Sequence, residues 1–150
     1  MITTVRTALR SELPAIVEIE QQSPTAAHWQ IGDYEKAIQD SGHLVLVACR
    51  EEQVLGSLVA SIATQEWELE NIAVVHNARR RGIGRDLINA LIVHARTAGA
   101  LEIRQEVRAS NSPAQKLGQA AGFMAEGRRR GYYRDPVEDA LLFKYLVKQA

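Results

Sequence analysis

One arginine and two glycines, Arg79, Gly82 and Gly84, have the spacing of a loop that binds an anionic group. They fit the pattern R-x-x-G-x-G, between an apolar stretch that ends near Val75 and a helical pattern that begins at Gly84. Glycine lets the main chain approach a ligand closely, and the N–H groups at a helix N-terminus attract negative charge. We therefore predict that residues 80–85 present backbone N–H groups to an anion such as a diphosphate.

Two other nucleotide-binding loops do not fit this segment. The dinucleotide pattern G-x-G-x-x-G would need a third glycine at Leu87, and the Walker pattern would need a Gly-Lys-Ser or Gly-Lys-Thr sequence, which is absent. The plainer interpretation is a connection between a strand and a helix, with glycines for the turn and a solvated arginine run.

Positive and negative residues balance in the 150-residue chain. Lys plus Arg and Asp plus Glu both number 18, so no overall charge favours nucleic acid or an anionic membrane. The single cysteine, Cys49, excludes an internal disulfide and a cysteine zinc cluster. The four histidines lack metal-ligand spacing, and the N-terminal segment lacks the apolar core of a signal peptide. We expect a cytoplasmic protein without a metal, a nucleic-acid partner or a membrane partner.

The apolar pattern predicts an α/β fold in a single domain over residues 1–150. Runs rich in β-branched residues predict strands over 2–7, 44–50, 54–64, 67–75, 101–108, 123–130 and 140–147. Helical spacing predicts four helices, which begin at Ser11 as N-cap, Gly32, Gly84 and Ser112. In the strand 101–108, one face is expected to carry Leu101, Ile103, Gln105 and Val107.

The strand 67–75 and the glycine turn after it resemble the acetyl-CoA binding segment of the GNAT acetyltransferase superfamily. The order of the predicted elements is similar to that fold over essentially the whole chain. The resemblance implies a mixed sheet of about seven strands, flanked by about four helices. It also implies that two central strands splay apart and form the acyl-CoA cleft.

Further segments narrow the resemblance to the enzymes that acetylate ribosomal proteins on an N-terminal alanine. They are EVRASNSPAQKLGQAAGF from Glu106 to Phe123, NIAV at 71–74 and RRRGYYRDPVEDALLF from 128 to 143. The implied function is transfer of an acetyl group from acetyl-CoA, a cosubstrate, to a primary amine, here the N-terminal α-amine of a protein. Two alternatives stay open: an acetyltransferase of small-molecule amines, and a catalytically weak regulatory domain that binds CoA.

The resemblance also implies roles for residues of the cleft. An amine must be neutral to attack a carbonyl, so a proton acceptor must lie near it. Glu106 stands at the position of the general base, and Glu68 and Glu70 are rivals on the preceding strand. The residues implied in cofactor binding, including main-chain donors to the oxyanion, are Ile72, Ala73, Val74, Arg79, Arg80, Arg81, Gly82, Ile83, Gly84, Arg85 and Asn111. Asn111 has an alternative role as the cap of the helix that begins at Ser112.

One position departs from the family pattern. The resembling enzymes carry a tyrosine that protonates the departing thiolate, and alignment through Asn111 places Gly118 there. Tyr132 or Tyr133 is one replacement, release of an unprotonated thiolate is another, and a weak or inactive protein is a third explanation. The arginine run 128–130 beside these tyrosines is expected to form a wall of the substrate cleft that attracts an acidic peptide or a small anion.

Overall fold

The computed structural model describes residues 2–23, 29–78 and 82–149. These residues form seven strands and four α-helices in the order that the sequence predicts. The bounds are β1 (Thr4–Thr7), α1 (Leu13–Gln21), α2 (Ile31–Gln39), β2 (His43–Arg50), β3 (Gln53–Ser61), β4 (Glu66–Val74), α3 (Ile83–Thr97), β5 (Glu102–Arg108), α4 (Ser112–Ala121), β6 (Met124–Tyr133) and β7 (Glu138–Leu146). Short 3-10 turns at Arg10–Glu12 and His76–Ala78 precede α1 and α3. None of the helices in these ranges is long and apolar enough to cross a membrane.

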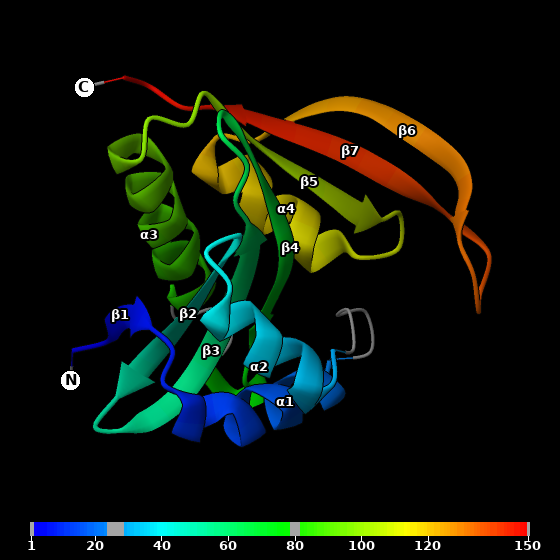
Figure 1. Cartoon of the computed structure of the whole chain (residues 1–150). Coiled ribbons are helices and arrows are strands. Elements are labelled where there is room, and N and C mark those ends of the chain that lie inside the picture. The colour runs from blue at the N-terminus through cyan, green and yellow to red at the C-terminus, as the bar shows by residue number, and fades with distance from the viewer. Residues whose placement is uncertain (1, 24–28, 79–81, 150) are drawn as a thin grey trace.

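The strands join one mixed sheet in the order β1-β2-β3-β4-β5-β7-β6. The pair β4 and β5 is parallel, and the other neighbouring pairs are antiparallel. Helices α3 and α4 cover one face of this sheet, and α1 and α2 cover the other (Figure 1). The mixed α/β architecture expected from the sequence is confirmed.

Alternation along β2 explains why the sheet has helices on both faces. Leu46 packs in the apolar cluster beneath α3, whereas its neighbour Val47 packs in the cluster beneath α1 and α2. Both side chains are fully buried. Because successive side chains of a strand point to opposite faces, a continuous apolar run such as LVLVAC needs cover on both sides. The two helical layers supply that cover.

The parallel pair β4 and β5 separates part-way along its length. The register between the two strands ends where Leu69 lies opposite Gln105, although β4 runs on to Val74 and β5 runs on to Arg108. Figure 1 shows that β4 and β5 diverge and that β5 runs alongside β7. The splayed central strands that the resemblance implies are therefore present.

An extra residue in β4, Glu70, marks the start of the separation. In the register with β3, Glu70 is left out between Leu69 and Asn71. A bulge of this kind bends the strand that carries it, so it turns the end of β4 away from β5. It also shifts the alternation, because Leu69 and Ile72 both pack in the cluster beneath α3.

A buried carboxylate ties the other helical layer to β4 immediately after the bulge. Glu20 of α1 is 0% exposed. It accepts hydrogen bonds from the hydroxyl of Tyr34, the side-chain amide of Asn71 and, at 3.1 Å, the main-chain N–H of Trp29. Burial, followed by the hydrogen bond to Glu20, raises the pKa of Tyr34 far above its usual range. The phenol of Tyr34 therefore stays a donor, and α1, α2 and β4 are held together.

Three details differ from the sequence prediction. Ser11 lies within the 3-10 turn and does not cap α1, whose N-cap is Glu12. The carboxylate of Glu12 is instead held by Arg6 at 2.6 Å. Leu101 precedes β5 and is exposed, so it does not share the buried face of that strand. Strand β6 extends to Tyr133 because it pairs with β7 as far as Glu138.

Candidate active site

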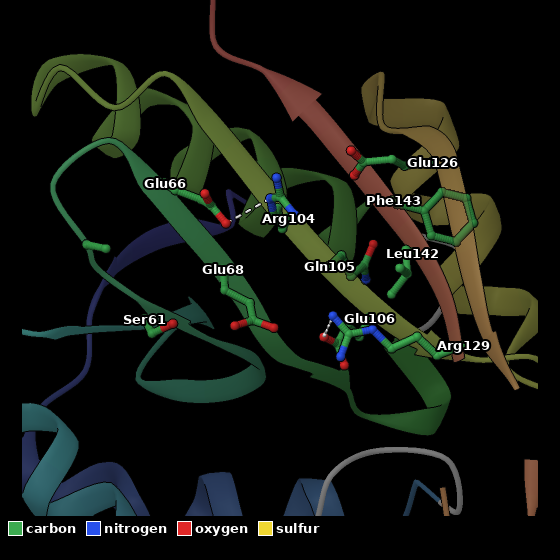
Figure 2. Close-up of a pocket in the computed structure, with 11 residues that line it drawn as sticks. Ser61, Glu66, Glu68, Arg104, Gln105, Glu106, Glu126, Arg129, Leu142 and Phe143 are labelled. Atoms are coloured by element: carbon green, nitrogen blue, oxygen red, sulfur yellow. Dashed lines mark ion pairs between the residues drawn. The ribbon is translucent and has the colours of Figure 1, made fainter. Parts of the chain in front are cut away.

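A pocket of about 400 Å³ is lined by residues of β4, β5, β6 and β7 and of the end of β3, beside the point where β4 and β5 separate. Its volume falls within the range of small-molecule sites, about 300 to 1,000 Å³. The lining residues are Ser61, Ala63, Glu66, Glu68, Arg104, Gln105, Glu106, Glu126, Arg129, Leu142 and Phe143. Figure 2 shows most of these side chains arranged along the strands around one open space.

Two carboxylates from neighbouring strands, Glu68 of β4 and Glu106 of β5, face this space (Figure 2). Desolvation by burial raises the pKa of Glu68, and the negative charge of Glu106 raises it further. Like charges so placed disfavour simultaneous ionisation. A carboxylate whose conjugate acid is weakened in this way accepts a proton more readily near neutral pH. The pocket therefore holds two groups that are able to accept a proton.

The carboxylate of Glu106 is held by two residues of β6. The hydroxyl of Tyr132 interacts with Glu106, and this interaction raises the pKa of Tyr132. Arg129 places Nη2 4.0 Å from Oε1 of Glu106. The guanidinium of Arg129 also lies 5.4 Å from the centre of the Tyr132 ring. These three side chains form one polar cluster at the side of the pocket.

The second tyrosine of β6, Tyr133, stands next to that cluster. Its ring meets the ring of Tyr132 edge-on, with the centroids 5.2 Å apart. The guanidinium of Arg108 covers Tyr133 at 4.4 Å from the ring centroid and lies 3.0 Å from Glu138. Burial raises the pKa of Tyr133, and the charge of Glu106 raises it further. That Tyr132 or Tyr133 protonates the departing thiolate stays a prediction.

The third carboxylate named from the sequence, Glu70, is not among the residues that line the pocket. It stands at the bulge, and its Oε2 lies 3.7 Å from Nε2 of His43. Desolvation raises the pKa of Glu70, and the neighbouring His43 opposes that shift. The structure thus brings Glu68 and Glu106 together at the pocket and places Glu70 beside it.

The residues that line the pocket carry more negative charge than we expected from the arginine run 128–130. Arg128 lies 3.5 Å from Asp139, and Arg104 lies 2.8 Å from Glu66, so these guanidinium groups are paired. Four glutamates and two arginines line the pocket. The wall therefore favours a cationic group such as an ammonium over the acidic peptide or small anion expected from the sequence.

The described part of the glycine loop begins at Gly82, which is the N-cap of α3. Its φ of +81° lies in the left-handed region that glycine adopts without strain. The side chain of Ile83 is buried in the core, so only the main chain of Ile83 can contact a ligand, whereas the side chain of Arg85 is exposed. Residues 79–81, which are Arg79, Arg80 and Arg81, lie outside the described ranges.

Gly84 has a packing role that the sequence did not indicate. A Cβ atom on Gly84 would lie 2.7 Å from Cδ2 of Leu117 in α4. Such a contact is too close, so the small size of Gly84 lets α3 and α4 approach each other. The glycine is needed for helix packing as well as for the anion site expected there.

The β4 segment implied in cofactor binding lies past the bulge. Its residues, Ile72, Ala73 and Val74, pair with β3 on one side, and on the other side β4 has parted from β5. The side chains of Ile72 and Val74 pack against the cluster beneath α3. The main chain is therefore the part of this segment that is placed to meet a ligand in the cleft.

Asn111 occupies the N-cap of α4. Its Oδ1 accepts a hydrogen bond from the main-chain N–H of Ala114 at 3.2 Å. This is the alternative role that the sequence left open for Asn111, and a contact with the cofactor stays a prediction.

Sequence reasoning did not place Arg104 or Gln105 in the site. The signal for Arg104 was present, because alternation along β5 puts it on the same face as Glu106. No local signal existed for Gln105, which shares the buried face of the strand. Only the packing of α4 against the sheet shows that Gly118 lies beside its side chain.

Comparison with known proteins identifies the family. The model of the Acetyltransferase (GNAT) family matches residues 7–123. The chain belongs to the GNAT acetyltransferase family. The protein is therefore an N-acetyltransferase, and acetyl-CoA is its acetyl donor.

Similar proteins cover nearly the same length. The ribosomal protein bS18-alanine N-acetyltransferase of Salmonella typhimurium is 33% identical over 135 residues, which is 88% of each chain. The enzyme of the same name from Escherichia coli K12 is 30% identical over 143 residues, or 94% of this chain and 95% of that one. The crystal structure of the ribosomal-protein-S18-alanine N-acetyltransferase from Escherichia coli has a TM-score of 0.86 at 29% identity, and covers 99% of this chain and 96% of that chain. The structure of Ard1 from Thermoplasma volcanium, at 24% identity and a TM-score of 0.87, has the same fold over 99% of this chain and all of its own.

Proposed function

We propose that this protein acetylates the α-amine at the N-terminus of a protein, and that ribosomal protein bS18 with its N-terminal alanine is the first acceptor to test. The observation that carries the proposal is the pocket beside the point where β4 and β5 separate, with Glu68 and Glu106 facing one space. The names of the relatives at 30% and 33% identity support the choice of acceptor.

The excess of carboxylates supports an amine as the acceptor. A free α-amine has a pKa of about 8 and is mostly protonated at neutral pH, so an ammonium is drawn toward a wall with four glutamates and two arginines. Acetylation removes this positive charge. The product therefore loses the attraction that brought the substrate into the pocket, which favours its release.

In the proposed reaction, Glu106 accepts a proton from the amine, directly or through one water molecule. It is the first residue of β5 beyond the register with β4, so its side chain stands at the opening of the splay. Tyr132 and Arg129 hold its carboxylate in place. The nitrogen, made neutral by this transfer, then bonds to the acetyl carbon as the bond from that carbon to sulfur breaks and its electron pair goes to sulfur. The second proton that the nitrogen loses passes to solvent. Glu68 faces the same space and is the alternative acceptor of the proton.

The main chain supplies the other interactions of the proposal. An N–H of the segment Ile72, Ala73 and Val74, beyond the bulge, donates to the carbonyl oxygen as it gains negative charge. The N-terminus of α3, at Gly82, Ile83, Gly84 and Arg85, donates N–H groups to the diphosphate of the cofactor. The left-handed conformation of Gly82 and the separation of β4 from β5 fit such a ligand.

The test uses intact-mass measurement of a peptide with the N-terminal sequence of bS18, incubated with the protein and acetyl-CoA. We expect one added acetyl group. A matched peptide with a blocked N-terminus and a free lysine should stay unmodified. If only small amines are acetylated, the protein is an acetyltransferase of small-molecule amines. If the cofactor binds and no acetyl group is transferred, the protein is a regulatory domain that binds CoA.

The Glu106→Gln variant separates binding from chemistry. Turnover should fall at least roughly tenfold at neutral pH, while calorimetry shows nearly unchanged affinity for CoA, because the carboxamide keeps the size and loses the basic oxygen. Glu68→Gln is the matched variant on the other side of the pocket. A larger loss in Glu68→Gln than in Glu106→Gln would move the role of the base to Glu68.

A further inference from the structure

A buried side-chain amide, Gln105, has a polar atom that the fold does not satisfy. Gln105 is 5% exposed. Among the residues that the structure describes, no donor lies within hydrogen-bonding distance of its Oε1. A buried acceptor without a donor is unfavourable, and most such atoms in folded proteins find a partner. A ligand that brings a donor, or that meets the amide after a rotation, would satisfy this group.

Gln105 stands at the vertex of the splay. It is the last residue of β5 in register with β4, opposite Leu69. Its side chain lies on the face covered by α4, where Oε1 is 3.0 Å from the position that a Cβ on Gly118 would take. The residue before it in α4, Leu117, contacts Gly84 at the start of α3. Leu117 and Gly118, which are consecutive in α4, therefore link the expected anion site at Gly84 with Gln105, at the point where the strands separate.

We propose that the carboxamide of Gln105 hydrogen-bonds the sulfur atom of the acetyl donor, in the space left by the absence of a side chain at Gly118. The inference rests on the proposed function, because it takes the splay as the place where the thioester lies. Gln105 then occupies the role at the sulfur that the family pattern gives to a tyrosine at position 118.

The chemistry differs from that of a phenol, because an amide does not give up a proton. When the bond between the acetyl carbon and sulfur breaks, its electron pair goes to sulfur as a thiolate. The Nε2–H groups of Gln105 donate to that thiolate, and the proton from the amine goes to Glu106. Once the thiolate takes up a proton from solvent, Oε1 accepts a hydrogen bond from the S–H group. Rotation about the last side-chain bond exchanges the nitrogen and the oxygen.

The first test compares the binding of CoA with that of desulfo-CoA, which lacks the sulfur atom. The wild-type protein should bind CoA more tightly, by up to about tenfold, as expected for one hydrogen bond between neutral groups. In Gln105→Leu, which has similar size and no polar atoms, this preference should disappear. The thermal midpoint of Gln105→Leu should stay unchanged or rise, because the substitution removes an unsatisfied buried group.

A double variant gives a second readout. Gln105→Leu should lower kcat about tenfold, and adding Gly118→Tyr to it should restore part of the loss, because leucine no longer opposes a side chain from position 118. Gly118→Tyr alone should gain little, since its Cβ would meet the amide oxygen at 3.0 Å.

The outcomes separate this inference from the proposed function. If wild type and Gln105→Leu show the same preference for CoA over desulfo-CoA, Gln105 does not contact the sulfur, and the proposed function stands. If the wild-type protein binds neither compound, both the inference and the proposed function are overturned.

Discussion

The phenol of Tyr132 lies beside the carboxylate of Glu106, and its interaction with this carboxylate raises the pKa of Tyr132. In the proposed reaction, Tyr132 therefore lies on the side of the cleft where the amine loses its proton. Gly118 and the amide of Gln105 meet on the other face of β5.

This contact makes ionisation of Tyr132 depend on Glu106. In Glu106→Gln the negative charge is gone, so we expect Tyr132 to lose its proton at lower pH than in the wild-type protein. Absorbance of the phenolate near 295 nm, followed in a pH titration, measures this change. The same comparison in a Tyr132→Phe background should show a smaller difference. A difference in that background as large as with Tyr132 present would assign the effect to Tyr133 instead.

The position of the two tyrosines also predicts their effect on rate. Because the hydroxyl of Tyr132 is engaged with Glu106, we expect Tyr132→Phe and Tyr133→Phe each to lower kcat less than about tenfold, as expected for loss of one hydrogen bond. Steady-state rates at saturating acetyl-CoA test this. A fall of roughly 100-fold or more in either variant would make that tyrosine the proton donor to sulfur.

The raised pKa of Glu68 predicts a stability that depends on pH. An acid with a higher pKa in the folded than in the unfolded protein binds more protons when folded, so stability is lost as pH rises through the folded-state pKa. Glu68→Gln removes this loss. We expect the variant to be more stable than wild type in urea unfolding at pH 8, and the gain to vanish below about pH 4, where the carboxyl is protonated in both states. Glu18→Gln, on the exposed side of α1, should change stability at neither pH.

The contact between Gly84 and Leu117 predicts a loss of stability without any ligand. Gly84→Ala places a Cβ 2.7 Å from the end of the Leu117 side chain, which must move to make room, so we expect a loss of up to about 1 kcal/mol in the free energy of unfolding after the gain in helix propensity is counted. In a Leu117→Ala background the same substitution should cost much less. Gly32→Ala is the control, because no atom lies near its Cβ position and alanine favours the helix by up to about 1 kcal/mol. Equal effects of Gly84→Ala in both backgrounds would exclude the packing role.

The hydrogen bond from Asn71 to the buried carboxyl group of Glu20 predicts a loss of stability when Asn71 is substituted. Asn71→Ala removes a donor to this group, and leaving a buried acceptor without this donor costs about 1 to 3 kcal/mol. We expect a lower free energy of unfolding by that amount in urea titration, and a larger loss in Asn71→Asp, which sets two carboxylates side by side. Asn89→Ala on the exposed side of α3 should stay within about 0.5 kcal/mol of wild type. A loss no larger than that of Asn89→Ala would mean that Asn71 does not stabilise Glu20.

Local patterns predicted most of the fold, because periodic apolar residues decide which face of an element is buried. The stripe of α3, which includes Leu87 and Leu91, and the alternation along β5 both appear as expected. Contacts between distant residues decided the rest. Ser11 lies in the 3-10 turn, and Glu12, which pairs with Arg6, is the N-cap of α1. The extension of β6 to Tyr133 depends on pairing with β7.

The candidate site was predictable only in part for a similar reason. The resemblance identified Glu106 and Gly118 one at a time, each from its own segment of sequence. The position of Gln105 beside Gly118 follows from how α4 lies against the sheet, and no spacing along the chain encodes it. The pairing of Arg104 with Glu66 likewise joins two strands, and it changes the charge expected of the cleft.

The bulge at Glu70 makes the opening between β4 and β5 depend on the number of residues in the strand. A substitution at position 70 by a residue suited to an exposed position leaves the number of residues in β4 unchanged, so the main-chain path stays intact. Deletion of the residue would restore regular pairing with β3 and would keep Leu69 and Ile72 on one face, because they would then be two positions apart. Ile72 and Val74 would stay in the core, and the local bend that the bulge gives β4 would be lost. The opening of the cleft therefore depends on the length of β4 at this point more than on the identity of residue 70.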